Sequence, residues 1–234
     1  MKFAVISAGE GSRLSQEGAP LPKPLTLLNG VPMIDRLLHL FMRCGATQIV
    51  VIINNESEMV KQHLDKLKEN LPLQVVVKTT PSSMHSFYEL APYLDGDRFC
   101  LTTVDTIFRE EEFAAFIRAF KESEKDGFMA VTDYVDDEKP LYIGTDSQLR
   151  ITGFYDAPIE EGRYISGGVY CLRQNALEVL QKCIRKGMSR MRNFQRELVT
   201  NGLELQAYPF GKILDVDHVE DIAKAEAFLA GSEQ

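Results

Sequence analysis

Two glycines, an arginine and a lysine near the N-terminus have the types and the spacing of a phosphate-binding loop. Residues 8–14 read Ala-Gly-Glu-Gly-Ser-Arg-Leu, and Lys23 follows ten residues after Arg13 in Pro-Lys-Pro-Leu. An apolar, strand-like run at 3–6 precedes the loop, so the glycines fall where a strand ends. Glycine lets backbone N–H groups approach an anion closely, and the two cations add fixed positive charge. Together these parts indicate a cradle for a triphosphate.

Two better-known glycine motifs do not fit this loop. A dinucleotide fingerprint needs a third glycine with a helix directly after it. Here Leu14 takes that place, and Glu-Gly-Ala-Pro at 17–20 is poor helix-forming sequence. A P-loop ends in Gly-Lys-Ser/Thr, a tripeptide absent from the chain. The glycines alone are also compatible with an ordinary turn, so the spacing from Arg13 to Lys23 carries the functional interpretation.

The sequence after the loop extends the pattern. Residues 22–25 read Pro-Lys-Pro-Leu, residues 30–34 read Gly-Val-Pro-Met-Ile, and an amphipathic helical pattern follows. A glycine loop ending in Ser-Arg-Leu, a downstream Pro-Lys-Pro and Gly-x-Pro-Met-Ile form the signature of the nucleotidylyltransferase superfamily. The chain resembles this superfamily, and within it the sugar-1-phosphate nucleotidylyltransferases (NDP-sugar pyrophosphorylases). The resemblance is dense over residues 3–54 and thinner to about residue 229.

The resemblance implies roles for the donor half of a site. Arg13 would bind the triphosphate and Lys23 would reach the transferred phosphate, which makes them the expected catalytic residues; a surface position is the alternative for Lys23 alone. Residues 79–87, Thr-Thr-Pro-Ser-Ser-Met-His-Ser-Phe, stand where the family has a Gly-Thr-Ala-like base-contacting loop, which leaves the base open. The expected nucleotide-binding residues are Ala8, Gly9, Gly11, Ser12, Arg13, Ser82 and Ser83.

Three aspartates are candidates for a Mg²⁺ site. Asp105 follows a strand-like segment at 98–103, and the carboxyl end of a central parallel strand faces the ligand crevice of such folds. A helix N-cap is its structural alternative. Residues 213–222 resemble the family's terminal Asp-Ile/Val-Asp-Thr-Pro-Glu-Asp segment, which implies that Asp215 or Asp217 also binds the metal. Capping and surface roles remain the alternative for both residues.

The acceptor half departs from the family pattern. Residues 164–170, Tyr-Ile-Ser-Gly-Gly-Val-Tyr, resemble the strand that holds the sugar, which implies Ser166 and Gly168 as acceptor-binding residues. The preceding Glu-Lys-Pro is replaced by Tyr-Asp-Ala-Pro at 155–158, without the lysine that meets the sugar phosphate. Either another cation replaces that lysine or the acceptor is not an ordinary hexose 1-phosphate. A basic segment (Arg185, Lys186, Arg190, Arg192 and Arg196) is either a solvated helix face or an acceptor-phosphate or partner-binding patch.

Composition and charge narrow the class of protein. The chain has 234 residues and a 44% hydrophobic content, which is typical of a globular protein. Its formal net charge of −8 argues against nonspecific binding to nucleic acid or anionic membranes. No apolar stretch reaches the length of a membrane span, and the first apolar run is too short for a signal peptide. The four cysteines show no Cys-x-x-Cys spacing and indicate a reducing compartment. We expect a cytoplasmic protein, with a homo-oligomer left open.

The alternation of elements predicts the fold. Strand-like runs at 3–7, 48–53, 73–77 and 98–103 alternate with helical patterns at 32–44, 56–70, 84–94 and 110–124, which favours a mostly parallel sheet covered on both faces. Close runs at 128–133, 141–145, 149–154 and 164–172 suggest an antiparallel extension, followed by helices at about 174–186, 190–201 and 219–230. We predict one α/β domain over 1–234, Rossmann-like and GT-A-like, with three α/β/α layers, a nucleotide-binding half (1–125) and an acceptor-binding half (126–234).

The favoured function is Mg²⁺-dependent transfer of a nucleotidyl group from a nucleoside triphosphate to a phosphorylated small-molecule acceptor, with release of pyrophosphate. A sugar 1-phosphate is the first choice of acceptor. A cytidylyltransferase for a phospho-alcohol such as phosphocholine and a catalytically silent nucleotide-binding paralogue are the alternatives. A GT-A glycosyltransferase that uses Asp215 and Asp217 as its Asp-x-Asp is disfavoured, because that motif belongs in the middle of such a chain.

Overall fold

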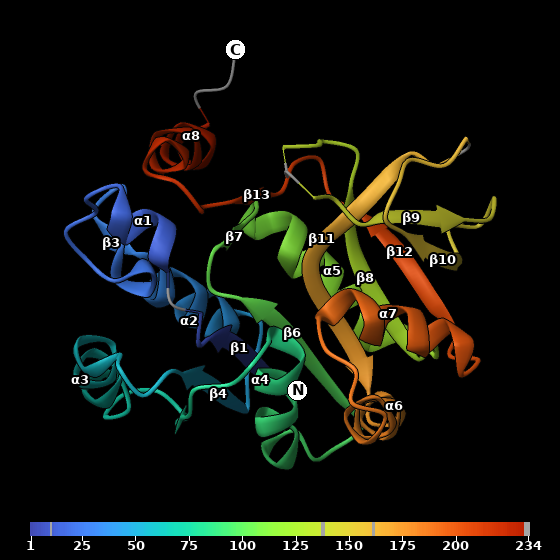
Figure 1. Ribbon diagram of the computed structural model, residues 1–234, viewed down its shortest axis with the longest axis horizontal. Helices are drawn as coiled ribbons and strands as arrows, with labels where there is room; N and C mark the ends of the chain where they lie inside the picture. Colours follow the sequence, from blue (N-terminus) through green and yellow to red (C-terminus); the bar gives the residue numbers. More distant parts are fainter. Residues whose placement is uncertain (10, 137–138, 161, 232–234) are drawn as a thin grey trace.

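Four parallel strands form one side of the main sheet, in the spatial order β6–β1–β4–β5 (Figure 1). The structure is a computed structural model that describes residues 1–9, 11–136, 139–160 and 162–231. The four strands are β1 (Lys2–Ser7), β4 (Gln48–Ile53), β5 (Leu73–Val77) and β6 (Arg98–Thr103). Phe3 pairs with Ile49 on one side and with Cys100 on the other. Helices cover both faces of these strands, which explains their continuous apolar runs. The four predicted strands are confirmed.

The second half of the chain extends the same sheet. The central strand of this part is β11 (Tyr164–Arg173), which runs antiparallel to β6, β8 and β9. The other strands are β8 (Gly127–Thr132), β9 (Tyr142–Thr145), β10 (Ile151–Tyr155) and β12 (Leu205–Pro209). The result is one nine-stranded mixed sheet, so the predicted antiparallel extension is confirmed. Strand β12, parallel to β8, was not predicted, because it is short and ends in a proline.

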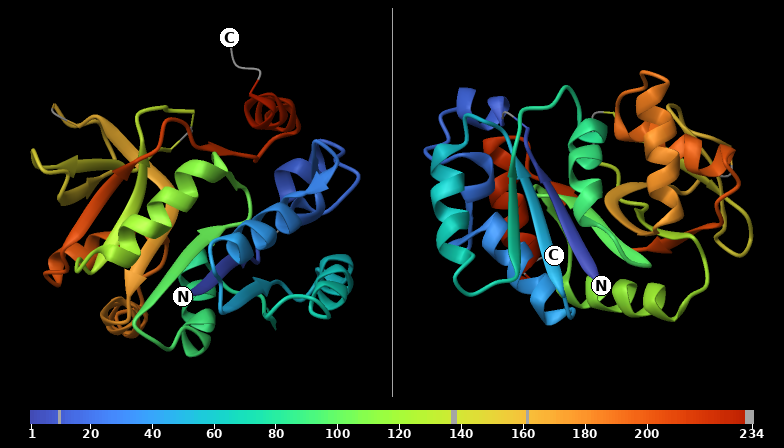
Figure 2. Two further views of the ribbon diagram at one scale, coloured as in Figure 1. Left: turned by 180° about the vertical axis from the view of Figure 1, so that it is seen from behind. Right: turned by 90° about the horizontal axis from the view of Figure 1, so that it is seen from below.

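Helices cover both faces of the sheet (Figure 2). On one face lie α2 (Met33–Arg43), α3 (Glu58–Leu67) and α5 (Glu110–Glu122), which pack on Phe3, Val5 and Val51. On the other face lie α4 (Ser83–Leu90), α6 (Asn175–Arg185) and α7 (Met191–Thr200). Neighbouring strand residues such as Ala4 and Ile6 point to that second face, as the two-residue period of a strand requires. The predicted α/β/α layering is confirmed.

A third, smaller apolar cluster joins the two ends of the chain. Helix α8 (Val219–Ala230) contributes Phe228 and packs with Leu14 and Val216. The short elements around it are α1 (Ser12–Gln16), η1 (Lys23–Leu25), β2 (Leu27–Leu28), β3 (Val31–Pro32), β7 (Thr106–Ile107) and β13 (Leu214–Asp215); η2 (Ala91–Tyr93) lies elsewhere, after α4. The sequence argued against a helix after the glycine loop, yet a five-residue helix forms there and ends before Gly18. No helix within the described residues has the length and apolarity to cross a membrane.

Candidate functional site

The glycine loop lines a pocket of about 520 Å³ at the carboxyl ends of the parallel strands. Of the predicted nucleotide-binding residues, the pocket wall includes Ala8, Gly9, Gly11, Arg13, Ser82 and Ser83. Ser12 begins α1, and its side chain is outside the described part of the structure. Ser7, at the end of β1, also lines the pocket; its hydroxyl is buried and has no hydrogen-bond partner among the described residues. An unpartnered buried hydroxyl on a pocket wall is a group that a ligand can satisfy.

Lys23 connects the loop to the carboxylates. Its Nζ lies 2.5 Å from Oδ2 of Asp105 and 2.6 Å from Oδ1 of Asp217. Burial alone would lower the pKa of the Lys23 ammonium, but the charge of Asp105 and then that of Asp217 outweigh it, so the pKa of Lys23 is raised. The ammonium therefore stays protonated and neutralises two carboxylates that come from distant parts of the chain. A lysine side chain only 13% exposed in this setting is not a solvated surface residue.

Gly11 makes the close approach between the loop and Lys23 possible. It precedes α1 with φ 58° and ψ 26°, the left-handed conformation that glycine adopts without steric cost. A Cβ at this position would lie 3.1 Å from Cβ of Lys23. Any larger residue would push the lysine away from the loop, so the glycine at this position has a packing reason as well as a conformational one.

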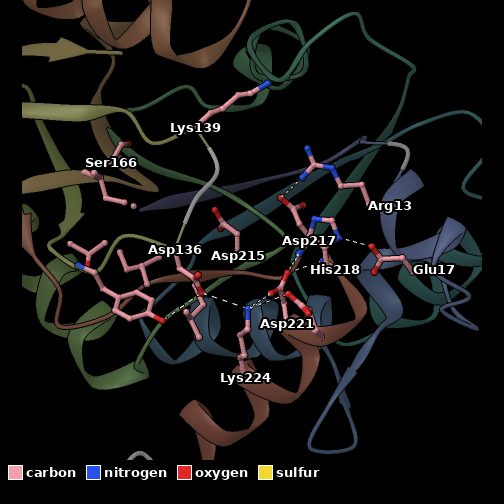
Figure 3. A pocket seen from close by; sticks show the side chains of 17 residues that line it. Arg13, Glu17, Asp136, Lys139, Ser166, Asp215, Asp217, His218, Asp221 and Lys224 are labelled. Carbon is pink, nitrogen blue, oxygen red and sulfur yellow. Dashed lines mark hydrogen bonds and ion pairs between the residues drawn. The ribbon is translucent and has the colours of Figure 1, made fainter. Parts of the chain in front are cut away.

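A second pocket of about 650 Å³ lies beside the first, and the two share Arg13 and Asp217 (Figure 3). One guanidinium nitrogen of Arg13 lies 3.2 Å from Oδ2 of Asp217, so the pair stands at the junction of the two pockets. The polar residues of the second wall include Tyr134, Asp136, Lys139, Ser166, Asp215, His218, Asp221 and Lys224. A ligand in either pocket can therefore reach the same arginine.

A bulge in β11 places Ser166 in the second pocket. Between Ser166 and Tyr170 the pairing of β11 with β8 shifts register, and Gly168 takes a φ of 72° inside this bulge. A Cβ on Gly167 would overlap Cδ1 of Ile213, which lies on the pocket wall. Among the described residues Gly167, not Gly168, lines the pocket. Gly168 instead shapes the strand, and its Cα faces the Thr106 side chain.

The two C-terminal aspartates have different surroundings. Asp217 shares the Lys23 ammonium with Asp105 and lines both pockets, whereas Asp215 lines only the second pocket. The backbone N–H of Val216, between them, donates to the carbonyl oxygen of Asp105 at 3.1 Å. This bond holds the residue after β13 against the turn between β6 and β7 that carries Asp105. The geometry therefore groups Asp105 with Asp217 and leaves Asp215 on the wall of the second pocket.

Three residues of the basic segment form ion pairs with neighbouring carboxylates. Arg192 and Arg196 both pair with Asp156, and these two contacts lower the pKa of the Asp156 carboxyl. Lys186 pairs with Glu197 on the same face. No member of the segment lines either of the two pockets as far as the structure describes them. This arrangement is that of a surface ion-pair network, and the hypothesis that the segment replaces the missing acceptor lysine loses its geometric support.

Sequence reasoning missed several residues on the pocket walls. Asn54 directly follows β4, and its Nδ2 donates to the carbonyl oxygen of Gly9 at 3.4 Å, which supports the glycine loop. The strand-end rule that selected Asp105 could have selected Asn54 as well. Tyr134 and Lys139 lie between β8 and β9 and Lys224 lies on α8, and neither segment has a local motif, so no signal in the sequence pointed to them.

Comparisons with known proteins match this fold. The profile described as Nucleotidyl transferase matches residues 3–232. A mannose-1-phosphate guanyltransferase of Schizosaccharomyces pombe is 27% identical over 192 residues, which cover 77% of this chain and 52% of that protein. The bifunctional protein GlmU of a Synechococcus strain is 23% identical over 241 residues, covering 98% of this chain and 38% of that protein. The inositol-1-phosphate CTP transferase from T. maritima has a TM-score of 0.79 at 19% identity, with 97% of both chains covered.

The chain spans between 38% and 62% of the length of the first curated relatives it matches. The family profile, in contrast, covers almost all of this chain and includes every residue that lines the nucleotide pocket from Ile6 to Asp217. The structural likeness at 19% identity supports the fold. On the strength of the profile match, the chain belongs to the Nucleotidyl transferase family.

Proposed function

We propose that this protein transfers a nucleotidyl group from a nucleoside triphosphate to a phosphorylated small-molecule acceptor, most simply a sugar 1-phosphate, and releases pyrophosphate. The observation that carries the proposal is the position of Lys23. Its ammonium lies between Asp105 and Asp217 in the first pocket, and Asp217 and Arg13 line both pockets. Transfer between two anions needs neutralised charge and fixed alignment, and this is the point where both reactants would meet.

Asp105 and Asp217 are the residues that would hold Mg²⁺. The Lys23 ammonium stands in for a cation here, because oxygens of both carboxylates lie within 2.6 Å of its nitrogen. No cluster of three or more His, Cys, Asp or Glu side chains suited to a metal occurs in the described residues. Two carboxylates fit Mg²⁺ well, since this ion keeps several waters and takes its other ligands from substrate phosphates. When bound, the ion supplies positive charge to the phosphate oxygens during transfer.

The remaining residues position and neutralise the reactants. The backbone around Gly9 and Gly11 offers N–H groups to the triphosphate, and Ser7 offers a buried hydroxyl without a partner among the described residues. Arg13 borders both pockets, so it stabilises charge on the donor and on the acceptor phosphate at once. Lys23 can follow the negative charge that develops on the transferred phosphate, since its long side chain is anchored only by ion pairs.

The names of the relatives support the class of acceptor. The Schizosaccharomyces pombe relative is named for mannose 1-phosphate and the T. maritima protein for inositol 1-phosphate, both of them phosphate esters of polyhydroxylated rings.

The described cysteines are free, as in a protein that works in the reducing cytoplasm, where nucleoside triphosphates are abundant. We therefore place the reaction in the cytoplasm.

The test is a matrix of donors and acceptors. Each of the four common nucleoside triphosphates is incubated with Mg²⁺ and with mannose 1-phosphate, glucose 1-phosphate, inositol 1-phosphate or phosphocholine, and pyrophosphate release is measured. We expect release with at least one sugar or inositol phosphate, and loss of release in Lys23→Ala with the fold retained by circular dichroism. Absence of release with every pair would support a silent nucleotide-binding paralogue, and full activity of Lys23→Ala would refute the proposed site.

A further inference from the structure

Behind the wall of the second pocket, a buried glutamine is hydrogen-bonded to Ser166. Gln195 lies on α7, is 2% exposed and is the residue toward which the Ser166 hydroxyl points. The Oγ of Ser166 donates to Oε1 of Gln195 at 3.2 Å, and Nε2 of Gln195 donates to the hydroxyl of Tyr170 at 3.3 Å. Neither the glycine loop nor the carboxylate pair involves these residues, so the network needs its own explanation.

The two ends of the glutamine amide face different partners. Its donor end, Nε2, faces the tyrosine oxygen, and its acceptor end, Oε1, faces Ser166. Burial raises the pKa of Tyr170 to about 12, so the phenol remains neutral at physiological pH. With the NH₂ group committed to Tyr170, the carbonyl oxygen of Gln195 is the group that faces Ser166.

This orientation decides what Ser166 can offer a ligand. A serine hydroxyl has one proton and two lone pairs. Ser166 contacts both Gln195 and the Tyr170 hydroxyl, so its proton is directed into this buried network and the side that faces the pocket presents a lone pair. A phosphate oxygen is itself an acceptor and gains no hydrogen bond there, and the quaternary ammonium of phosphocholine has no N–H to give. A hydroxyl group of a sugar or a cyclic polyol can donate to Ser166 directly.

We propose that Gln195 is a positioning residue that holds Ser166 as a hydrogen-bond acceptor, so that the acceptor pocket selects a polyol phosphate by one of its hydroxyl groups. The polyol ring would then lie against Ser166 and its phosphate toward Arg13, which the two pockets share. This inference rests on the proposed function and narrows its substrate class. It favours sugar or inositol phosphates over phospho-alcohols without a free hydroxyl.

The variants that test the inference are Gln195→Leu, Ser166→Ala and their combination. Loss of one hydrogen bond from a buried pair is worth about tenfold in affinity. We expect the KM for the polyol phosphate to rise about tenfold in each single variant and no further in the double variant, because both remove the same interaction. The KM for the nucleoside triphosphate and kcat should stay within about twofold of the wild type, a split that general damage to the protein would not give. Gln181→Leu, the same substitution at an exposed position of α6, is the matched control.

A second measurement does not depend on turnover. Saturation-transfer NMR gives the Kd of inositol 1-phosphate, mannose 1-phosphate and phosphocholine for the wild type and for Ser166→Ala. Ser166→Ala leaves the sequence of α7 unchanged, so it can be used even if Gln195→Leu fails to fold. We expect a polyol phosphate to bind, about tenfold more weakly to the variant, and phosphocholine not to depend on Ser166. Weaker polyol binding by the variant without turnover of any pair would refute the proposed function and support this inference. Preferred turnover of phosphocholine, or unchanged KM and Kd in the variants, would overturn the inference while the proposed function stands.

Discussion

The Nζ of Lys23 lies 2.6 Å from Oδ1 of Asp217, although 194 residues separate them. The contact closes the site, because it brings the C-terminal segment before α8 onto the loop that follows β1. It also places an ammonium where a divalent cation would have its carboxylate ligands. Two cations cannot occupy the same position between Asp105 and Asp217, so in the proposed site the lysine and a metal ion would compete for this pair of carboxylates.

Lys23→Met should therefore have opposite effects on metal binding and on turnover. Without the ammonium, the two carboxylates are free to bind a divalent ion, and the affinity of the nucleotide-free protein for Mn²⁺ should increase. Electron paramagnetic resonance of free Mn²⁺ measures this affinity. Turnover should fall about 10²–10³-fold, the usual cost of removing one charge-stabilising group from a transfer site.

Lys61→Met is the matched control for this prediction. Lys61 pairs with Asp65 on α3, and Lys68 pairs with the same aspartate, so loss of Lys61 removes a lysine ion pair without freeing a pair of carboxylates. This variant should bind Mn²⁺ and turn over substrate as the wild type does. Unchanged or weaker Mn²⁺ binding by Lys23→Met would contradict the competition between the lysine and the metal.

Asp217→Asn and Asp215→Asn should separate metal binding from acceptor binding. Asp217 shares Lys23 with Asp105, whereas Asp215 lines only the acceptor pocket. We expect Asp217→Asn to raise the Mg²⁺ concentration required for half-maximal rate by about tenfold or more, since one of two protein carboxylates is lost. Asp215→Asn should leave that concentration unchanged and alter the acceptor KM. A Mg²⁺ titration at saturating substrates measures this concentration in both variants. A higher Mg²⁺ requirement in Asp215→Asn, with none in Asp217→Asn, would assign the metal to Asp215.

Gly167→Ala should destabilise the protein through the bulge of β11. A Cβ at this position would overlap Cδ1 of Ile213 and lie 3.1 Å from the carbonyl oxygen of Ala130 on β8, which cannot move without breaking the sheet. Overpacking of this kind costs about 1–3 kcal/mol, measurable as a lower midpoint of urea unfolding. Gly9→Ala is the stability control, because nothing lies within 4 Å of a Cβ there. Equal midpoints for the two variants would mean that the bulge relaxes.

The donor half of the site follows from local sequence patterns. Continuous apolar runs such as 48–53 identify parallel strands, and the ends of those strands locate Asp105 and the glycine loop. Lys23 was found through its spacing from Arg13, which a loop of fixed length preserves. These residues could be placed together in one pocket because each placement depends on residues that are close together in the sequence.

The acceptor half depends on contacts that no local pattern records. Asp215 and Asp217 are two residues apart, about 6.6 Å along an extended chain, and only the pairing of β13 with β7 decides which one reaches Lys23. Gln195 lies in a helix whose periodicity marks it as a core position, but not as the partner of Ser166. The sequence likewise predicts Gly168 as an acceptor-binding residue, and only contacts with distant segments show that Gly167 lines the pocket while Gly168 faces Thr106.

His218 and Glu17 should give the stability of the protein a specific pH dependence. Nδ1 of His218 lies 2.6 Å from Oε1 of Glu17, and the other oxygen of that carboxylate accepts from the N–H of Val219, so the pair joins α1 to the start of α8. The hydrogen bond to Glu17 raises the pKa of His218 above 6.5, with Asp221 acting in the same direction and Arg13 against it. The hydrogen bonds to His218 and then to Val219 lower the pKa of Glu17 below 4.5.

The two shifts define a window of pH. The contribution of His218 is complete below pH 6.5 and is lost as the pH rises through its raised pKa in the folded protein. The contribution of Glu17 is complete above pH 4.5 and is lost as the pH falls through its lowered pKa. The difference in Tm between the wild type and His218→Gln, measured in EDTA to exclude metal, should therefore be largest between pH 4.5 and 6.5 and should shrink as the pH rises above 6.5. Glu17→Gln should show the same profile, and the double variant should be no less stable than either single one, because all three lack the same contact. A difference that grows as the pH rises would show that the imidazole is neutral in this contact.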